Sequence, residues 1–421
     1  MSLTQLTQTL TPPHTTPDKP GYDYDLVIVG GGIVGLTLAA ALKDSGLSIL
    51  LIEARVTSAA VTKGQAYAVH LLSARIFQGI GIWDKILPNI AKYRQVSLSD
   101  ADYPDVVKFQ TADLGTQTPE LGYVAEHSAL LEPLQEFVKN CANVTYLCPA
   151  EVMKTQNEKD IVTVNIKVAD EQQTIRTKLL VAADGSRSPI RQAAGIKTKG
   201  WKYWQSCIVA FVRPEKSHNY TAYEKFWTSG PFAILPLPGN RCRIVWTAPH
   251  EEAKALCALS NEEFLVELTK RYGDQMGKLE LLGDRFIFQV QLMQSDRYVL
   301  PRLALVGDAA HNCHPVGGQG LNLGIRDAAA LAEVIQTAHQ NGADIGKIEV
   351  LKQYEQWRKK ENLAILGFTD LLDRVFSNNF LPVVIIRRLG LWFMQRVPIL
   401  KIFALKLMIG LTGKTPELGK Q

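Results

Sequence analysis

Apolar residues occur in this chain as four short runs, and two of these runs are followed by segments with a helical repeat. Runs of four or five mainly aliphatic residues are typical of strands buried on both faces of a parallel sheet. They occupy residues 26–29, 48–52, 179–183 and 303–306. Apolar positions then recur with a 3.6-residue period up to Leu42, before Gly46, and from Leu321 to His339, before Asn341-Gly342. These patterns predict strand–turn–helix units of an α/β protein.

The pattern changes between residues 195 and 300. Segments rich in Val, Ile, Phe and Trp, separated by turn residues, predict strands at 207–214, 224–238 and 241–249. Residues 261–273 have the repeat of a helix. The chain therefore carries a β-rich part inserted in an α/β part, and residues 230–240 are expected to form a strand that enters the active site.

The first glycine motif lies between two of the predicted buried strands. Gly30, Gly32 and Gly35 form a GxGxxG turn in which Gly30 permits the tight turn, Gly32 a close phosphate and Gly35 close helix packing. The helix N-terminus presents free N–H groups to a pyrophosphate. Glu53, followed by Ala54 and Arg55, ends the next strand, where an acid can bind a ribose. The unit predicts a dinucleotide site, and it leaves FAD and NAD both open.

Two later segments repeat this strand-to-turn arrangement. Asp184-Gly185 follows the strand at 179–183, and Gly307-Asp308 follows the strand at 303–306. The loop 315–320 contains Pro315, Gly317 and Gly320, and a helix begins near Leu321 and Asn322. Free N–H groups at such a helix start stabilise negative charge on a ligand.

The three motifs together resemble the fingerprints of single-component FAD-dependent aromatic hydroxylases, which share the para-hydroxybenzoate hydroxylase fold. They are GxGxxG, the mid-chain ADGxxSxxR and the late GDAAHxxxPxxGQGxNxG. Residues 75–86, 121–127 and the tail resemble the ubiquinone-biosynthesis hydroxylase branch. The likeness spans roughly residues 22–410.

The resemblance implies specific roles for the matching residues. Gly30, Gly32, Gly35 and Glu53 would hold the ADP half of FAD, and Asp308 the ribityl and pyrophosphate region. Gly320, Leu321 and Asn322 would lie by the isoalloxazine, and Pro315 would line the reaction cavity. The branch commonly has Arg at the positions of Gln65 and Ser128, and this difference puts details of the FAD contacts in doubt.

The implied fold is α/β: a Rossmann-like FAD-binding domain built from separated segments, a β-rich substrate domain and a C-terminal helical tail. We expect a disordered arm at 1–21 and FAD-binding segments at 22–195 and 296–345. The substrate domain is placed at 196–295, and basic, apolar C-terminal helices at 346–421. Trp204, Phe226, Trp227 and Trp246 are candidates for an aromatic pocket, although ordinary core packing is the more common role of such residues.

The implied reaction is hydroxylation of an aromatic intermediate of quinone biosynthesis, a prenylated phenol, by O2 through a flavin C4a-hydroperoxide. Either NAD(P)H or a ferredoxin is expected as electron donor. No catalytic residue is assigned, and His70, Tyr67 and Tyr203 are three candidates for a phenol base. A prenyl-lipid reductase, a hydroxylase of another aromatic and a non-catalytic flavin-binding assembly subunit remain alternatives.

The histidines of the third motif raise the question of a metal site. His311 and His314 are three residues apart, but Pro315 and the glycines around them exclude a shared regular helix face. No cluster elsewhere completes a tetrahedral set. We therefore predict no metal, and a structural hydrogen-bonding role for His311.

The distribution of charge bears on nucleic-acid binding and on the role of the tail, and the cysteine content bears on the cellular compartment. The net charge is +5, but residues 380–421 hold seven basic residues and one acid, so the body offers no basis for nucleic-acid binding. Six cysteines without a CxxC pair and no signal peptide indicate a cytoplasmic protein. The tail has no run of 18 uncharged apolar residues, and Pro398 divides it. It can lie peripherally on the cytoplasmic membrane face, join a quinone-synthesis complex or pack on the FAD domain.

Overall fold

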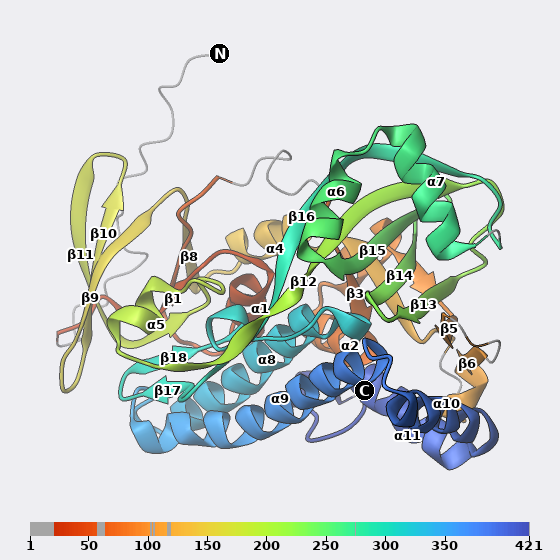
Figure 1. Cartoon of the computed structure of the whole chain (residues 1–421). Coiled ribbons are helices and arrows are strands. Elements are labelled where there is room, and N and C mark those ends of the chain that lie inside the picture. Colours follow the sequence, from red (N-terminus) through yellow and green to blue (C-terminus); the bar gives the residue numbers. More distant parts are fainter. Residues whose placement is uncertain are drawn as a thin grey trace.

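The computed structural model describes residues 21–56, 64–101, 103, 106–115, 119–273 and 275–420. The arm predicted at residues 1–21 lies, except for Gly21, outside the described residues. Two large sheets and one small sheet, with helices between and around them, make up the rest of the chain (Figure 1).

The first large sheet has a parallel centre built from the predicted apolar runs. Its strand order is β17–β18–β11–β1–β2–β8, and β1 pairs in parallel with β11 and with β2. The bounds are β1 (Tyr24–Val29), β2 (Ile49–Ile52), β8 (Val144–Leu147), β11 (Glu171–Ala182), β17 (Val299–Leu300) and β18 (Leu303–Leu305). All six residues of β1 and all four of β2 are buried, which confirms the predicted strands. Strands β9 (Glu151–Asn157) and β10 (Val162–Val168) extend β11 as an antiparallel ribbon.

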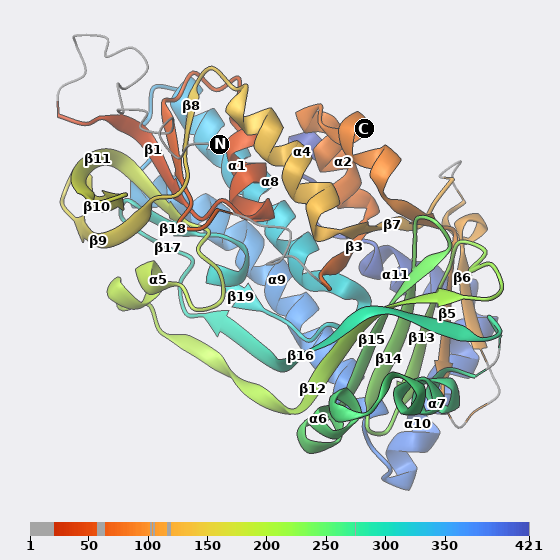
Figure 2. The same ribbon diagram turned by 90° about the horizontal axis from the view of Figure 1, so that it is seen from above.

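Helices pack beside this sheet (Figure 2). The two helices that follow glycine loops, α1 (Ile33–Ala41) and α8 (Gln319–Gln340), contact each other. Close to them lie α2 (Leu71–Ile80), α4 (His127–Lys139) and the long α9 (Ile348–Phe376). Short helices α3 (Trp83–Ile86) and α5 (Pro189–Ala193) complete this part. The predicted helix at 321–339 is thereby confirmed.

The second large sheet has the order β19–β16–β12–β15–β14–β13–β5–β6. Its strands are β5 (Gln95–Asp100), β6 (Val106–Gln110), β12 (Thr198–Pro214), β13 (Thr221–Trp227), β14 (Gly230–Leu237), β15 (Arg241–Pro249), β16 (Leu279–Ser295) and β19 (His311–Asn312). A small sheet of β3 (Ala66–His70), β7 (Gly122–Glu126) and β4 (Ala91–Tyr93) lies beside it. The segment 22–195 thus supplies strands to all three sheets.

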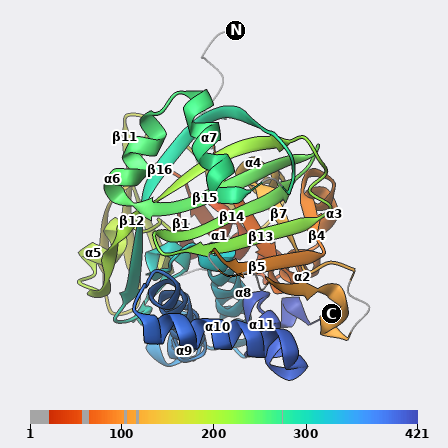
Figure 3. The same cartoon turned by 45° about the vertical axis from the view of Figure 1, so that its right-hand side comes forward.

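The two faces of the second sheet are covered differently (Figure 3). Helices α6 (His250–Ala258) and α7 (Asn261–Tyr272) cover one face, where Ile208, Trp246 and Phe264 are in one apolar cluster. The other side faces α8 and the C-terminal helices α10 (Leu381–Arg396) and α11 (Pro398–Met408). The predicted division of the tail at Pro398 is confirmed.

The C-terminal helices α10 and α11 pack on the second large sheet, and the last residues, Glu417–Gly419, contact α2 and α8 of the FAD-binding part. Arg387 of α10 donates from Nε to Asp100 of β5 over 2.9 Å, and both side chains are buried. Lys401 of α11 pairs with Asp113 at 2.7 Å. Leu391 and Leu405 belong to one apolar cluster with residues of β5, β6 and β13. The end strands of the sheet and the end of the chain therefore stabilise each other.

Candidate active site

The first glycine loop leaves no room for side chains at two of its three glycines. A Cβ on Gly30 would lie 2.2 Å from the carbonyl oxygen of Ala183, and one on Gly35 only 1.9 Å from that of Gly30. Gly30 also has a φ of +113°. Gly32, the N-cap of α1, has no atom within 4 Å of the same position, so its side is open to a ligand.

Glu53 lies directly beside this loop. Its carboxylate accepts hydrogen bonds from the backbone N–H of Gly31 at 2.7 Å and of Arg55 at 2.8 Å. These contacts place an acid, at the end of β2, next to the N-terminus of α1. Ala54 and Arg55 follow it as exposed residues.

The second and third motifs are tied together by a buried arginine. Arg191 donates to the carbonyl oxygens of Ala309 and Ser186, both at 2.8 Å. Asp184 accepts a hydrogen bond from the Ile190 N–H at 3.3 Å, and burial raises the pKa of Asp184. Its other carboxylate oxygen, Oδ1, is buried and has no partner among the described residues.

The third motif places Asp308 at the end of the buried strand β18. Gly307 turns the chain with a φ of +59°, and the side chain of Asp308 is exposed to a cavity. The protein surrounding the carboxylate still raises its pKa. Gly317 and Gly318, with φ of +66° and +60°, form the turn that leads into α8.

Asn322 connects this motif to β3. Its amide donates to the carbonyl oxygens of Ala68 and Gly318, both at 2.8 Å. Its Oδ1 accepts from the backbone N–H of His70 and from Ser73 Oγ. All of these bonds are internal to the protein, and Asn322 is not among the residues that line the cavity.

The cavity lies between the glycine loops and the second large sheet, which is called the substrate sheet below. It has a volume of about 410 Å³. Its nucleotide end is lined by Gly32, Gly185, Asp308, Pro315, Gly317, Gly320 and Leu321. The opposite wall comes from β13, β14 and β15, which confirms that residues 230–240 enter the site. Leu405, Met408 and Ile409 of the C-terminal segment close it on another side.

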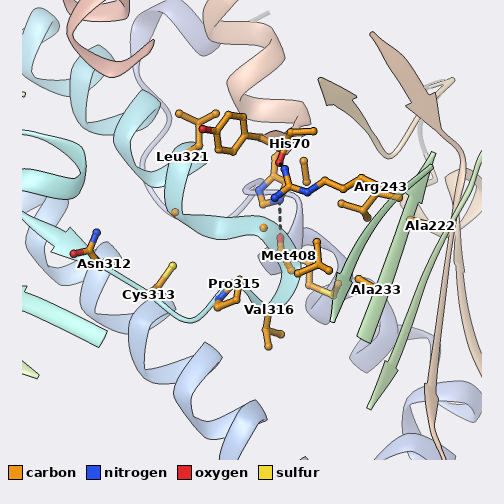
Figure 4. Close-up of a pocket in the computed structure, with 18 of the residues that line it drawn as sticks. His70, Ala222, Ala233, Arg243, Asn312, Cys313, Pro315, Val316, Leu321 and Met408 are labelled. Atoms are coloured by element: carbon orange, nitrogen blue, oxygen red, sulfur yellow. Dashed lines mark hydrogen bonds between the residues drawn. The ribbon is translucent and has the colours of Figure 1, made fainter. Parts of the chain in front are cut away.

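Figure 4 shows Arg243 of β15 reaching across the cavity toward His70 of β3. A guanidinium N–H of Arg243 donates to the carbonyl oxygen of Ala66, while its Nε has no partner among the described residues. His70 Nε2 lies 3.0 Å from the Gly317 carbonyl oxygen, and burial is the main cause that lowers the pKa of His70 to about 3. Burial likewise raises the pKa of Tyr67 to about 12.

The histidine-rich part of the third motif is structural. His311 Nε2 is 2.6 Å from Asp327 Oδ2, as expected for a hydrogen-bonding residue. His314 Nε2 is 3.6 Å from Asp373. Within the part of the chain that the structure describes, no three His, Cys, Asp or Glu side chains converge on a possible metal position.

The four candidate aromatic residues do not line the cavity, and ordinary core packing, their more common role, is found for Phe226 and Trp246. Trp204 is exposed, Phe226 stacks on Phe376 with centroids 4.0 Å apart, and Trp246 is packed against Phe232 under α6 and α7. None of these, nor Trp227, lines the cavity. Of the proposed bases, Tyr203 donates to Asp370 at 2.6 Å outside the cavity, whereas Tyr67 and His70 line it.

Comparison with known proteins assigns this arrangement to a family. A family described as "FAD binding domain" matches residues 23–369. The chain is 38% identical over 396 residues to the ubiquinone hydroxylase UbiL of Rhodospirillum rubrum, covering 93% of this chain and 91% of that protein. The chain belongs to the FAD-dependent aromatic hydroxylases.

Other relatives place it in the ubiquinone-biosynthesis branch of these hydroxylases. It is 33% identical over 392 residues to the 3-demethoxyubiquinol 3-hydroxylase of Escherichia coli, covering 92% and 98% of the two chains. An uncharacterized Synechocystis protein is 51% identical over 94% of this chain and 95% of its own. The solved p-nitrophenol 4-monooxygenase of Pseudomonas putida shares the fold, with a TM-score of 0.77 at 19% identity over 91% and 98% of the chains.

The residues of this hydroxylase fit its cofactor. Gly30 and Gly35 are sterically required, while the side of Gly32 is clear of protein atoms at the N-terminus of α1. The buried Asp184 Oδ1 has a free acceptor that a ligand hydroxyl can use. FAD is therefore the cofactor of this chain, and NAD(P)H and O2 are typical of the class.

Sequence reasoning missed two charged residues of the cavity, Glu224 and Arg243. The alternation in residues 221–227 places Glu224 on the same strand face as Ala222 and Phe226, which is a signal that the site side of β13 carries an acid. The pattern does not show which face of the strand meets the cofactor.

Proposed function

We propose that this hydroxylase adds a hydroxyl group to a hydrophobic aromatic substrate, a prenylated phenol of quinone biosynthesis. The supporting observation is the cavity that runs from the glycine loops and Asp308 to an apolar face of the substrate sheet and to α11. The names of the relatives UbiL and 3-demethoxyubiquinol 3-hydroxylase support the same substrate class.

Each residue of the nucleotide end has a proposed part in binding. Gly32 and the N-terminus of α1 would receive the pyrophosphate, Glu53 the adenosine ribose and Asp308 the ribityl hydroxyls. The N–H groups of Gly320 and Leu321, at the start of α8, would face the pyrimidine part of the flavin. When bound and reduced, FAD supplies the chemistry that activates O2, while the protein orients the ring and excludes water.

The first test is the visible spectrum of the purified protein and the identity of its released chromophore. We expect oxidised-flavin bands and FAD. The holoprotein is then reduced anaerobically with NADH, NADPH or a ferredoxin system and mixed with O2 and a prenylated phenol. A product heavier by one oxygen atom supports the proposal. Saturation of a prenyl double bond without oxygen uptake supports a reductase instead, and a protein that takes up no flavin refutes both.

We also propose that the C-terminal helices contact an anionic membrane surface. No helix in the described ranges is long and apolar enough to cross a membrane. Apolar side chains nevertheless stay exposed on α10 and α11, with Ile386 at 66%, Ile399 at 82% and Phe403 at 59%. The exposed cations Arg396 and Lys406 lie among them, and residues 380–416 contain no acid. An apolar face with basic residues and no acids is typical of interfacial helices.

This contact is tested by sedimentation with vesicles of phosphatidylcholine alone or with phosphatidylglycerol. We expect binding to the anionic vesicles, and its loss in an Ile399→Ser/Phe403→Ser variant. Val266→Ser, on the exposed side of α7, is the matched control because Val266 is 55% exposed. Equal binding of all three proteins would contradict the proposed surface.

A further inference from the structure

The inward face of the substrate sheet carries one acid in an otherwise largely apolar surface. Alternating residues of three strands line the cavity: Ala222 and Glu224 of β13, Pro231, Ala233 and Leu235 of β14, and Arg243, Val245 and Thr247 of β15. Strand pairing aligns Glu224 with Ala233 and Ala233 with Val245, so these three form one row across the face. Among the described residues of this sheet that line the cavity, Glu224 is the only acid.

Glu224 lies where the substrate sheet meets the loop that precedes α8. Its side chain is 9% exposed, and its carboxylate accepts a backbone hydrogen bond from Gly317. Gly317 follows Pro315 in the loop before α8, and this loop lines the cavity at the proposed flavin position. The carboxylate is thus placed between the substrate wall and the reaction centre.

Burial raises the pKa of Glu224 to about 7, and the hydrogen bond from Gly317 only partly opposes this shift. Cys207 of β12 is close enough for Glu224 to raise the thiol pKa, and Arg243 is the cation on the same sheet face. A carboxylate with a pKa near the working pH is well suited to take up and return a proton.

The other titratable groups of the cavity are poorly suited to that task. The pKa of His70 is lowered to about 3, so its ring stays uncharged at neutral pH and is a weak base. The pKa values of Tyr67 and Tyr93 are raised by burial, so both stay neutral phenols. The pKa of His127 is lowered by burial, and Asp308 lies at the nucleotide end.

We propose that Glu224 is the base that removes the proton from the ring hydroxyl of the substrate. This inference rests on the proposed hydroxylase function. The O–H bond of the substrate breaks, the proton bonds to a carboxylate oxygen of Glu224, and the electron pair stays on the phenolate oxygen. No oxidant or reductant takes part in this step. The phenolate makes the ring richer in electrons and therefore more reactive toward an electrophilic oxygen, and Glu224 returns the proton when the product leaves.

The decisive variant is Glu224→Gln, which keeps the shape of the side chain and removes its basicity. The holoenzyme is given a prenylated phenol, and product formed, O2 consumed and H2O2 released are measured between about pH 5.5 and 9. In the wild-type enzyme we expect hydroxylation to rise with pH through about 7, because the carboxylate is the active form. In the variant we expect about a hundred-fold slower hydroxylation, no rise in this range and H2O2 in place of product.

A substrate analogue with an electron-withdrawing ring substituent separates the role of a base from a role in folding. The phenol of this analogue is already ionised at neutral pH. With this analogue as substrate, the rate of hydroxylation by Glu224→Gln should therefore approach the rate of the wild-type enzyme. Glu120→Gln is the matched control, because Glu120 is a buried acid outside the cavity that pairs with Lys92 at 3.1 Å. We expect this control to keep the wild-type pH profile.

The outcomes distinguish this inference from the proposed function. If the wild-type enzyme forms no hydroxylated phenol, the proposed function fails and the role of Glu224 fails with it. If the wild-type enzyme hydroxylates and Glu224→Gln keeps its pH profile and its yield of product per O2, only the role of Glu224 is overturned. The same holds if the variant binds FAD and substrate but the ionised analogue restores nothing.

Discussion

Asp327 should be the strongest single determinant of the stability of the third motif. It is fully buried in α8 and accepts hydrogen bonds from the Gly307 N–H at 3.2 Å, His311 at 2.6 Å, Arg358 at 2.9 Å and Asn362 at 3.0 Å. Although burial opposes ionisation, His311 and Arg358 lower the pKa of Asp327 from 3.8 to about 2. One carboxylate therefore holds the turn at Gly307 against α8 and α9.

The magnitude follows from this shift and from the charge left behind. A shift of about two pKa units corresponds to about 2.5 kcal/mol of stability. Asp327→Asn also leaves Arg358 buried, with Glu361 as its remaining carboxylate partner. Removing one member of a buried pair typically costs about 3–5 kcal/mol. We expect the free energy of unfolding to fall by about 3 kcal/mol at pH 7, and FAD to bind more weakly because the Asp308 turn loosens.

Urea unfolding of the holoprotein, followed by circular dichroism and flavin fluorescence, measures both effects. Because the folded-state pKa is depressed, the wild-type advantage should be complete above about pH 4 and be lost only as pH falls toward about 2. Glu361→Gln is the matched control, since this partner is 25% exposed and should cost less than about 1 kcal/mol. A loss below about 1 kcal/mol in Asp327→Asn, or a difference that shrinks between pH 8 and 5, would refute the reasoning.

Four further substitutions test other parts of the structure. Glu224→Gln should stabilise the protein by up to about 3 kcal/mol at pH 8 and by nothing at pH 4, because the cost of the raised pKa builds up between pH 4.5 and about 7; urea unfolding at both values checks this. Gly35→Ala should lower the melting temperature because its Cβ would collide with the carbonyl oxygen of Gly30. Gly32→Ala should leave the melting temperature unchanged, because nothing lies within 4 Å of its Cβ, and it should weaken FAD binding as measured by titration. Arg387→Ala leaves the carboxylate of Asp100 buried without this partner and should lower the free energy of unfolding by about 3 kcal/mol in the same assay. A loss under about 1 kcal/mol would contradict a stabilising role for the contact between α10 and β5.

The cofactor end of the site was predictable from the sequence because its signals are local. Each buried strand, its glycine turn and the following helix lie within about twenty residues, and turn chemistry determines the turn directly. His311 is a partial case: its role as a hydrogen-bonding residue was predicted, but its partner Asp327 was not. That partner lies 16 residues later in the sequence, in α8, where it also contacts Arg358 of α9, so no local pattern identifies it.

Apart from the strand within residues 230–240, the substrate end was not predictable, because it depends on pairing between distant segments. β5 pairs in parallel with β13, more than a hundred residues later, and β15 lies in the same sheet two strands from β13. Because side chains alternate between the two faces of a strand, the sequence assigns Glu224 to one face of β13. Only the pairing of β13 with the other strands shows that this face is turned toward the cavity. Trp204 and Trp246, which were candidates for an aromatic pocket, do not line the cavity, since Trp204 is exposed and Trp246 is buried under α6 and α7.

The C-terminal helix α11 shows why the tail cannot be assigned to packing or to a surface alone. Leu405, Met408 and Ile409, in or just after α11, line the cavity, while Ile399 and Phe403 stay exposed on the outside. Deleting the tail would therefore remove a cavity wall together with the exposed face, and activity and membrane contact would be lost at once. Substitutions on the outer side alone separate the two. If a prenyl tail enters beside α11, the Ile399→Ser/Phe403→Ser variant should keep its activity on a short-chain phenol in solution and lose it on a long-chain phenol held in vesicles. Equal losses on both substrates would place the effect inside the cavity.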